Sequence, residues 1–223
     1  MKQEEIINMF DSIAPSYDKV NRIVSFGIDK KWREDAIKEV IKIKKPNKVL
    51  DIACGTGDMI EIWKKHGVDI CGVDPSIGML NVAKQRFKDV KFYNLSATDL
   101  KDINNNCADA ISISFGIRNV VEIDKAIKEF YRVLNKKGIV LILEFTKSNN
   151  PLRKVVDIYT NKVMPKIGGM LSKNEEAYKY LSNSIENFYT ADELINLFEK
   201  EKFKLLKKQS FNFGQVSLII LQK

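Results

Sequence analysis

The sequence predicts an α/β fold built on a doubly wound, mostly parallel sheet of seven strands. Strand-like and helix-like segments alternate through the middle of the chain, which is typical of parallel sheets. The last two strand segments are too close together for a crossover helix, so they must pair as an antiparallel hairpin. A length of 223 residues, 44% of them hydrophobic, suits one domain with a substantial core.

Each element of this sheet has its own signal. The residues from Gly138 to Phe145 are almost wholly apolar, as expected of a central strand covered on both faces. Ser76 is a suitable N-cap for the helix that follows the second strand. The predicted strands are 49–52, 68–73, 90–95, 108–114, 138–145, 203–209 and 212–221, and the predicted helices are 59–66, 76–87 and 122–134.

Two helical additions are expected within this single domain of residues 1–223. Residues 146–188 have helical periodicity but no strand, with Leu152, Val155 and Tyr159 on one face. An insertion after the fifth strand lies above the carboxyl edge of the sheet, where open α/β folds bind their ligands. We therefore expect residues 146–188 to form a lid, together with a cap made by residues 1–35.

The strongest local signal is a glycine turn between the first strand and its helix, Asp51–Asp58. Gly55 and Gly57 allow a ligand to approach the backbone because neither carries a Cβ atom. Asp74 ends the second strand, where an acid can accept hydrogen bonds from both hydroxyls of a ribose. These residues predict a site for a nucleoside cofactor.

A dinucleotide-binding turn is the rival interpretation. It needs a third glycine where this chain has Ile60. Asp58 at the start of the helix would repel a pyrophosphate and attract an ammonium group, such as that of a methionine moiety. The turn therefore favours a cofactor that carries an amino acid.

Two further segments would complete the pocket. Ser96 and Ala97 follow the third strand and could cover an adenine, while Ser114 follows the fourth strand and would lie at the floor of the active site. The alternatives are that Ser96 only caps a turn and that Phe115 only belongs to the core.

Composition and charge narrow the classes of function. No apolar run is long enough to span a bilayer, and the N-terminus lacks the pattern of a signal peptide, which predicts a cytoplasmic protein. Three scattered cysteines and the single His66 argue against a disulfide framework and a metal site. The net charge of +8 comes from dispersed lysine pairs, and without a motif for a flipped base we expect no nucleic-acid partner.

The chain resembles the ubiquinone/menaquinone-biosynthesis C-methyltransferases from about Phe10 to the C-terminus. The motifs in the N-terminal region, after the fourth strand and in the lid are specific to that family. The motifs that carry the resemblance are Phe10-Asp11, Tyr17 to Asn21, Ser25-Phe26-Gly27, Trp32, Asp51 to Asp58, Ile113 to Asn119, Tyr131 to Leu134, Leu143-Glu144-Phe145, Pro165 to Gly168 and Tyr178 to Ile185.

The resemblance implies a class I S-adenosylmethionine-dependent methyltransferase with a Rossmann-like sheet, an antiparallel last strand and a helical lid. It maps the cofactor contacts to Thr56, Asp74, Ser96, Ala97 and Ser114. The chain departs from the family pattern at four places: Asp29 stands for the usual His, Ser96 for Asn, Asn135 to Gly138 for Lys-Pro-Gly-Gly, and Thr146 for Ser.

The implied reaction is C-methylation of a prenylated quinol ring, with demethylmenaquinol as the expected substrate and the benzoquinol of ubiquinone synthesis as the alternative. Because a phenol has a pKa of about 10, the site must favour the phenolate. We expect Arg118 and Asn119 to stabilise that charge and to hold a water that carries the proton away. Tyr178, Tyr159 and Tyr180 are candidates to line the quinol ring, although a core role is equally compatible with their spacing.

Other possibilities stay open. The acceptor could be a different small molecule, or the chain could bind the cofactor without catalysing a reaction. A prenyl tail and a positive net charge would allow peripheral contact with an anionic membrane at the inner face of the cytoplasmic membrane. The sequence leaves open whether the chain forms a homodimer.

Overall fold

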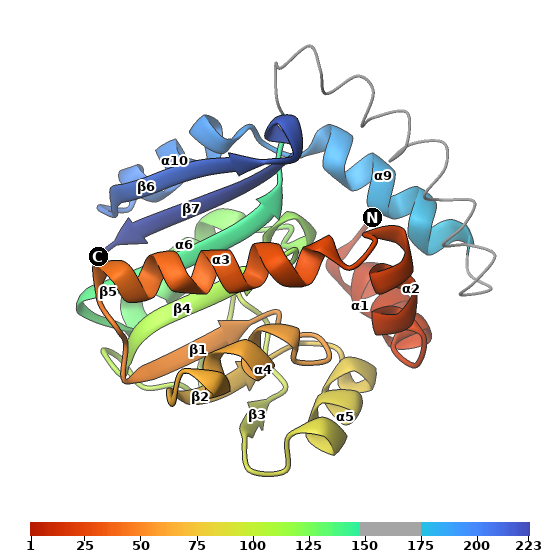
Figure 1. Cartoon of the computed structure of the whole chain (residues 1–223), viewed down its shortest axis with the longest axis horizontal. Helices are drawn as coiled ribbons and strands as arrows, with labels where there is room; N and C mark the ends of the chain where they lie inside the picture. The colour runs from red at the N-terminus through yellow and green to blue at the C-terminus, as the bar shows by residue number, and fades with distance from the viewer. Residues whose placement is uncertain (148–174) are drawn as a thin grey trace.

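The computed structural model describes residues 1–147 and 175–223 and shows a sheet of seven strands in the order β3-β2-β1-β4-β5-β7-β6 (Figure 1). The five strands that come first in the chain pair in parallel, and β7 is antiparallel to both β5 and β6. This arrangement confirms the predicted sheet and its terminal hairpin. The strands are β1 (Lys48–Ile52), β2 (Asp69–Val73), β3 (Lys91–Tyr93), β4 (Ala108–Ser114), β5 (Leu134–Phe145), β6 (Lys204–Phe211) and β7 (Val216–Gln222).

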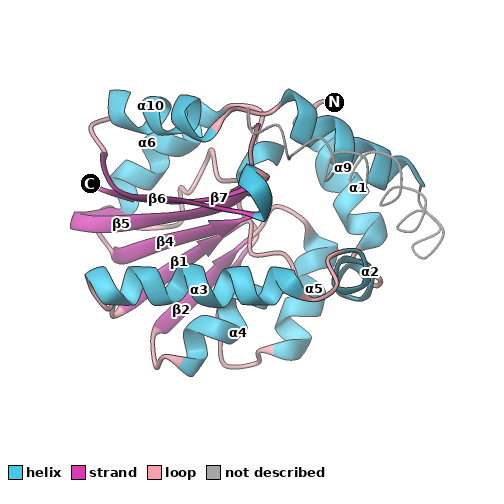
Figure 2. Cartoon of the chain, turned by 45° about the horizontal axis from the view of Figure 1, so that its top comes forward, coloured by secondary structure: helices cyan, strands magenta, loops and turns pink. Residues whose placement is uncertain are grey.

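Helices cover both faces of the sheet (Figure 2). On one face, α3 (Ile28–Ile43) and α4 (Asp58–Lys65) pack with Trp32 and Trp63 against alternate side chains of the strands. On the other face, α6 (Ile123–Val133) and α10 (Ala191–Lys200) bury a second cluster around Phe130 and Phe198. Because side chains alternate along a strand, the apolar run in β5 supplies both clusters, as a central strand must.

The N-terminal helices α1 (Gln3–Ile13) and α2 (Tyr17–Val24) lie beyond the carboxyl ends of the parallel strands, next to α9 (Glu175–Asn187) (Figure 1). Helix α1 contacts both α5 (Ile77–Arg86) and α9. The predicted lid residues Leu152, Val155 and Tyr159 lie outside the described residues.

Several boundaries differ from the prediction for local reasons. The last strand begins at Val216 because residues Asn212–Gly214 form a 3-10 turn in which Phe213 is left-handed. Strand β5 begins at Leu134, before the turn expected at Asn135 to Gly138. Helix α10 was not predicted, although Thr190 and Glu193 form the capping box that announces a helix start.

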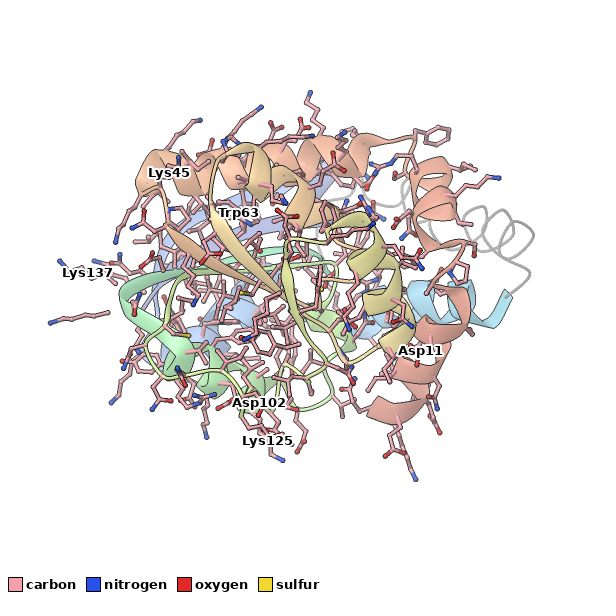
Figure 3. All side chains as sticks on the ribbon, turned by 90° about the horizontal axis from the view of Figure 1, so that it is seen from below. Asp11, Lys45, Trp63, Asp102, Lys125 and Lys137 are labelled. Carbon is pink, nitrogen blue, oxygen red and sulfur yellow. The ribbon has the colours of Figure 1, made fainter. Side chains whose placement is uncertain are left out.

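The charged side chains lie mainly on the surface. Lys45, Asp102, Lys125 and Lys137 are exposed at the periphery, whereas the indole of Trp63 is fully buried (Figure 3). Its Nε1 donates a hydrogen bond to Ser112 Oγ at 3.1 Å, which satisfies a buried donor. Among the described helices, none is long and apolar enough to cross a membrane.

Candidate active site

The glycine turn after β1 has the backbone that its residues predict. Gly55 and Gly57 both have left-handed φ angles, 55° and 96°. At Gly57 a Cβ would also lie 2.6 Å from the Phe87 ring, whereas a Cβ at Gly55 would meet nothing within 4 Å. Gly57 is therefore required by conformation and by packing, and Gly55 mainly by conformation.

Asp74 at the end of β2 holds the turn in place. Its Oδ2 accepts a hydrogen bond from Gly55 N and its Oδ1 accepts one from Ser76 N, both at 2.8 Å. Ser76 is the N-cap of α5, as predicted, and its hydroxyl accepts from Met79 N. Burial raises the pKa of Asp74 to about 6, and these two backbone donors oppose the rise.

Asp51 at the end of β1 is a buried carboxylate with one oxygen that accepts no hydrogen bond from the described residues. Its Oδ1 accepts a hydrogen bond from Ser112 Oγ at 2.6 Å, whereas no described residue bonds to Oδ2. Burial raises the pKa of Asp51 to about 7, and Arg33 and the Ser112 hydroxyl lower it only in part. Because an unpaired buried carboxylate is costly, the site fits a ligand that brings an ammonium group to Oδ2.

Asp58 stands at the start of α4, as the sequence predicted. Its carboxylate pairs with Arg86 at 3.2 Å and with Arg22 at 3.4 Å, so two cations already compensate its charge. It does not line the cofactor pocket described next. Asp51 does not line that pocket either, and the two carboxylates differ in that Asp58 is paired whereas Asp51 Oδ2 has no partner among the described residues.

A pocket opens over the glycine turn at the carboxyl edge of the sheet. Of the predicted cofactor residues, Gly55, Asp74, Ser96, Ala97 and Ser114 line it. Asp51, Thr56 and Gly57 do not line it; Thr56 is buried, with Oγ1 donating to Asp18 Oδ1 at 2.5 Å. The pocket therefore gathers residues from the ends of four neighbouring strands, as expected of this kind of fold.

For Ser96 and Phe115 the sequence allowed either a structural role or a place in the pocket, and the structure shows both. Ser96 Oγ accepts a hydrogen bond from Thr98 N at 3.2 Å, so it caps a turn and also lines the pocket. Phe115 packs against Trp32 and Phe145 in the core, and it lines the same pocket.

The N-terminal helices close the other side of this pocket with residues that the sequence motifs did not identify. Gln3, Ile6, Ile7, Phe10 and Tyr17 all line it. The side chain of Gln3 both donates to Asn119 O at 3.1 Å and accepts from Val121 N at 3.0 Å. The cap is thereby attached to the segment after β4. The sequence carries no signal that separates Gln3 from its polar neighbours Glu4 and Glu5.

Two aspartates attach the same cap to the cofactor loops. Asp11 accepts hydrogen bonds from Ser76 Oγ at 2.6 Å and from Gly78 N at 2.7 Å. Asp18 accepts the bond from Thr56 and also pairs with Arg86. Helices α1 and α2 are therefore part of the wall of the site.

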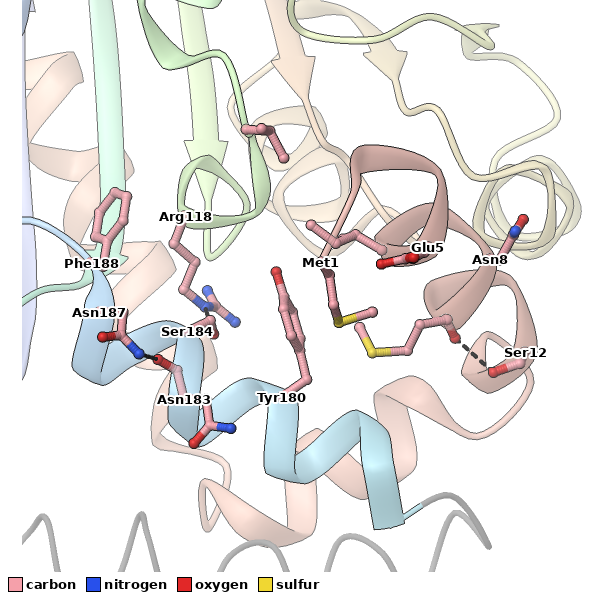
Figure 4. Close-up of a pocket in the computed structure, with 13 residues that line it drawn as sticks. Met1, Glu5, Asn8, Ser12, Arg118, Tyr180, Asn183, Ser184, Asn187 and Phe188 are labelled. Carbon is pink, nitrogen blue, oxygen red and sulfur yellow. Dashed lines mark hydrogen bonds between the residues drawn. The ribbon is translucent and has the colours of Figure 1, made fainter.

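A second and larger cavity of about 870 Å³ lies between α1 and α9 (Figure 4). Arg118 and Tyr180 lie side by side in its wall, opposite Met1 and the α1 residues Glu5 and Asn8. Ile6 borders both cavities, and Arg118 in this one is followed in sequence by Asn119 in the other. The predicted catalytic pair therefore stands where the two cavities meet.

Arg118 is held by a buried ion pair that the sequence did not predict. Its Nη1 donates to Glu144 Oε1 at 2.6 Å and to Phe115 O at 2.8 Å, and the Glu144 side chain is fully buried. Nε donates to Ser184 Oγ on α9 at 3.3 Å. Burial raises the pKa of Glu144, while Arg118 lowers it. These contacts fix the plane of the guanidinium at the wall of the larger cavity.

Asn119 is fixed by an aromatic residue of α9. Tyr180 Oη donates to Asn119 Oδ1 at 3.1 Å, which leaves the amide Nδ2 without a partner among the described residues. Of the other tyrosines considered for the acceptor, Tyr159 lies outside the described residues, and for Tyr178 the structure describes only its place on α9. Tyr180 is therefore the tyrosine whose side chain the structure brings to the cavity. No cluster of three or more metal-ligating side chains occurs in residues 1–147 and 175–223.

Comparison with known proteins gives a consistent result. The model of the ubiE/COQ5 methyltransferase family matches residues 1–223. The chain is 48% identical to the ubiquinone/menaquinone biosynthesis C-methyltransferase UbiE of Campylobacter jejuni strain 81-176, over 100% of this chain and 99% of that protein. It is 35% identical to the demethylmenaquinone methyltransferase of Bacteroides fragilis strain ATCC 25285, over 100% of this chain and 94% of that protein.

Solved structures share the fold at low sequence identity. A possible histamine N-methyltransferase from Thermotoga maritima superposes with a TM-score of 0.65 at 20% identity, covering 97% of this chain and 99% of that one. The [4+2]-cyclase SpnF superposes with a TM-score of 0.72 at 15% identity, covering 100% of this chain and 97% of that one. At these identities, the likeness concerns the fold.

Proposed function

The chain belongs to the ubiE/COQ5 methyltransferase family and is an S-adenosylmethionine-dependent methyltransferase, and from this premise we propose that it methylates a ring carbon of a prenylated quinol. We further propose demethylmenaquinol as the acceptor and menaquinol as the product. The names of relatives from Bacteroides fragilis and Thermotoga maritima support this choice. The name of the Campylobacter jejuni relative includes ubiquinone as well, so the benzoquinol of ubiquinone synthesis is the second candidate.

The observation that carries the proposal is the meeting of two cavities at Arg118 and Asn119. The smaller cavity has the carboxylates and glycine turn that suit the cofactor, whose sulfonium supplies an electrophilic methyl group when bound. The larger one would hold the acceptor. A ring carbon that enters from the larger cavity would then approach the methyl group at the junction of the two cavities. Holding these two reactants in the correct relative orientation contributes strongly to the rate.

Arg118 and Asn119 would act on the acceptor oxygen. Removing the hydroxyl proton of a quinol raises the electron density of the ring, and the resulting phenolate needs a donor in a site of low polarity. Arg118 Nη2 and Asn119 Nδ2 make no hydrogen bond within the described part of the chain, so both can donate to that oxygen. A water held between them would carry the proton to solvent.

The ion pair with Glu144 limits Arg118 to the role of a hydrogen-bond donor. Since the carboxylate compensates the guanidinium, the buried pair is neutral overall and stable in an apolar wall. Arg118 is thereby a fixed donor, not a base. The acceptor oxygen would meet the edge of the guanidinium that Glu144, Phe115 and Ser184 leave unused.

The prenyl tail supports peripheral contact with the inner face of the cytoplasmic membrane. A very apolar tail stays in lipid unless the protein covers it, and a net charge of +8 attracts the protein to an anionic leaflet. Flotation with anionic and with neutral vesicles tests this point. Failure of the protein to float with either type of vesicle would contradict it.

Turnover with defined quinols tests the proposed reaction. Purified protein is incubated with S-adenosylmethionine and either reduced demethylmenaquinone or the demethylated benzoquinol, and products are identified by mass. We expect one added methyl group on the naphthoquinol ring. Arg118→Met should lower kcat by about 10²–10³-fold, since it removes one donor of the phenolate site. The proposal fails if the wild-type protein binds the cofactor but methylates neither quinol.

A further inference from the structure

The turn between α2 and α3 exposes apolar side chains that the candidate active site does not use. Phe26 has 83% of its surface exposed, and Ile23 and Ile28 on either side of it are 41% and 45% exposed. Because only the short connection from Ser25 to Gly27 separates the two helices, these three side chains lie at one corner of the molecule and are named here the corner patch. Neighbouring exposed apolar side chains of this size are typical of an interaction surface.

The backbone of this turn is fixed by specific contacts. Phe26 and Gly27 both have left-handed φ angles, 52° and 73°. Ser25 Oγ accepts a hydrogen bond from Gly27 N at 3.2 Å and donates one to Asp29 Oδ1 at 2.7 Å. A bulky residue is unfavourable at a left-handed position, and such positions are enriched at functional sites. The exposure of Phe26 therefore belongs to an ordered turn.

Exposed lysines stand next to the corner patch on both helices. On α2, Lys19 lies one turn before Ile23 on the same helix face, and on α3, Lys31 lies one turn after Ile28. Both lysines are exposed, and neither is part of an ion pair within residues 1–147 and 175–223. Their charges are therefore available to an anionic partner.

The acids of the same segment do not cancel this charge. Between residues 17 and 31 the sequence has two acids, Asp18 and Asp29. Asp18 pairs with Arg86 at 3.1 Å, and the buried Asp29 pairs with Arg22 and Arg33. The corner therefore combines apolar side chains with an excess of positive charge.

We propose that the corner patch docks the protein on an anionic lipid bilayer. This rests on the proposed function, because a prenylated acceptor resides in lipid. The apolar side chains would enter the boundary between headgroups and acyl chains, while Lys19 and Lys31 would meet the anionic headgroups. Helix α2 lies next to α1, which forms a wall of the larger cavity (Figure 1). Docking at this corner thus brings the acceptor cavity to the membrane that holds the acceptor.

A bilayer suits the corner patch better than a second copy of the chain. Three side chains cover far less than the roughly 800 Å² that each partner buries in a stable protein interface. Two copies that met symmetrically through this corner would also place Lys19 and Lys31 near the same lysines of the other copy. An anionic leaflet has the complementary charge.

Vesicle flotation of the full chain tests the proposal, with vesicles of phosphatidylcholine alone and of an equimolar mixture with phosphatidylglycerol. Phe26→Asn should lower the partition coefficient about 10–100-fold, because an inserted phenyl ring is lost. Asparagine tolerates a left-handed backbone, so the turn should be kept. Lys31→Gln should lower binding about 5-fold, and only with the anionic vesicles. Thermal unfolding of each variant reports folding separately.

Ile43→Gln is the matched control for Ile23→Gln. Ile43 is 43% exposed and also has lysines on both sides, but it lies at the other end of α3, about 22 Å from Ile28 (Figure 1). We expect Ile23→Gln to weaken vesicle binding and Ile43→Gln to leave it unchanged. The proposal is overturned if the two variants weaken binding equally, if Phe26→Asn has no effect, or if Phe26→Asn changes the oligomeric mass in sedimentation and leaves vesicle binding unchanged.

Turnover assays separate this proposal from the proposed reaction. With a demethylated naphthoquinol whose tail is short and water-soluble, Phe26→Asn should turn over at the wild-type rate. With a long-tailed quinol in anionic vesicles, its rate should fall in parallel with vesicle binding. A loss of turnover with the short-tailed quinol would place Phe26 in the site and overturn its role in docking. If the wild-type protein methylates neither quinol, the proposed function fails, and the flotation result alone decides the role of the corner patch.

Discussion

The pH dependence of cofactor binding follows from the burial of Asp51. Its pKa is raised to about 7, first by burial, while Asp74 and Asp58 raise it further and Ser112 and Arg33 oppose the rise. An ammonium group pairs only with the ionised carboxylate. A bound cofactor therefore selects the ionised form, and the affinity must fall as the pH drops through 7.

The magnitude can be worked from that pKa. The apparent Kd is multiplied by one plus the ratio of protonated to ionised Asp51, which is about 1.3 at pH 7.5 and about 11 at pH 6.0. Binding of S-adenosylhomocysteine should thus weaken about eightfold over this interval. Asp74, whose pKa is about 6, adds a factor of about 2 by the same arithmetic.

Titration calorimetry in buffers of different ionisation heat measures both the affinity and the protons released. We expect the wild-type protein to release about 1.4 protons per ligand at pH 6.0, about 0.9 from Asp51 and about 0.5 from Asp74, and about 0.3 at pH 7.5. Asp51→Asn keeps an oxygen acceptor but cannot ionise, so only the contribution of Asp74 should remain. A wild-type affinity that is flat between these pH values, or a variant that keeps the eightfold change, would refute the reasoning.

The same shift has an opposite consequence for the ligand-free fold. A carboxyl group whose pKa is higher in the folded than in the unfolded chain costs stability once it must ionise. The cost sets in as the pH rises above the unfolded value near 4 and is complete above 7. Asp51→Asn should therefore raise the free energy of unfolding at pH 8 by up to about 4 kcal/mol, with little effect at pH 4. Urea unfolding at both pH values measures the difference.

Four further substitutions test other contacts. Gly57→Ala should lower the free energy of unfolding by about 1–3 kcal/mol, and Gly55→Ala by only about 1 kcal/mol, because a Cβ at position 57 also meets Phe87; equal costs in urea unfolding would contradict the packing argument. Glu144→Gln leaves the guanidinium of Arg118 without its buried countercharge and should cost about 3–5 kcal/mol by the same assay. Tyr180→Phe removes the bond to Asn119 and should lower kcat about 2–10-fold with unchanged affinity for S-adenosylhomocysteine; a change in that affinity instead would place Tyr180 on the cofactor side.

The parts of the fold that the sequence predicted well are those with strong local patterns. The apolar run in β5, the capping hydroxyl of Ser76 and the closeness of the last two strands each depend on neighbouring residues, and all three are confirmed. The turn at Phe213 and the start of β5 were missed. Their backbone conformations depend on strand pairing, to which local propensity contributes little.

In the candidate site, too, the sequence predicted the residues with local patterns better than the contacts between distant elements. The glycine turn and Asp74 follow one another at fixed spacing after the strands, so both could be located in the sequence. Asp58 shows the limit of that approach. Its expected partner was a ligand, but Arg22 and Arg86 reach it from elements far away in the chain.

By itself the sequence determined the sheet, the glycine turn, the acid that follows the second strand and the family to which the chain belongs, because these depend on residue type and spacing along one chain. Only the tertiary structure decided that Asp51 Oδ2 is unpaired, that Glu144 holds Arg118, and that Arg33 reaches Ser114. Hydrogen bonds between side chains depend on distances of a few ångströms between elements that are distant in sequence, and no local pattern specifies those distances.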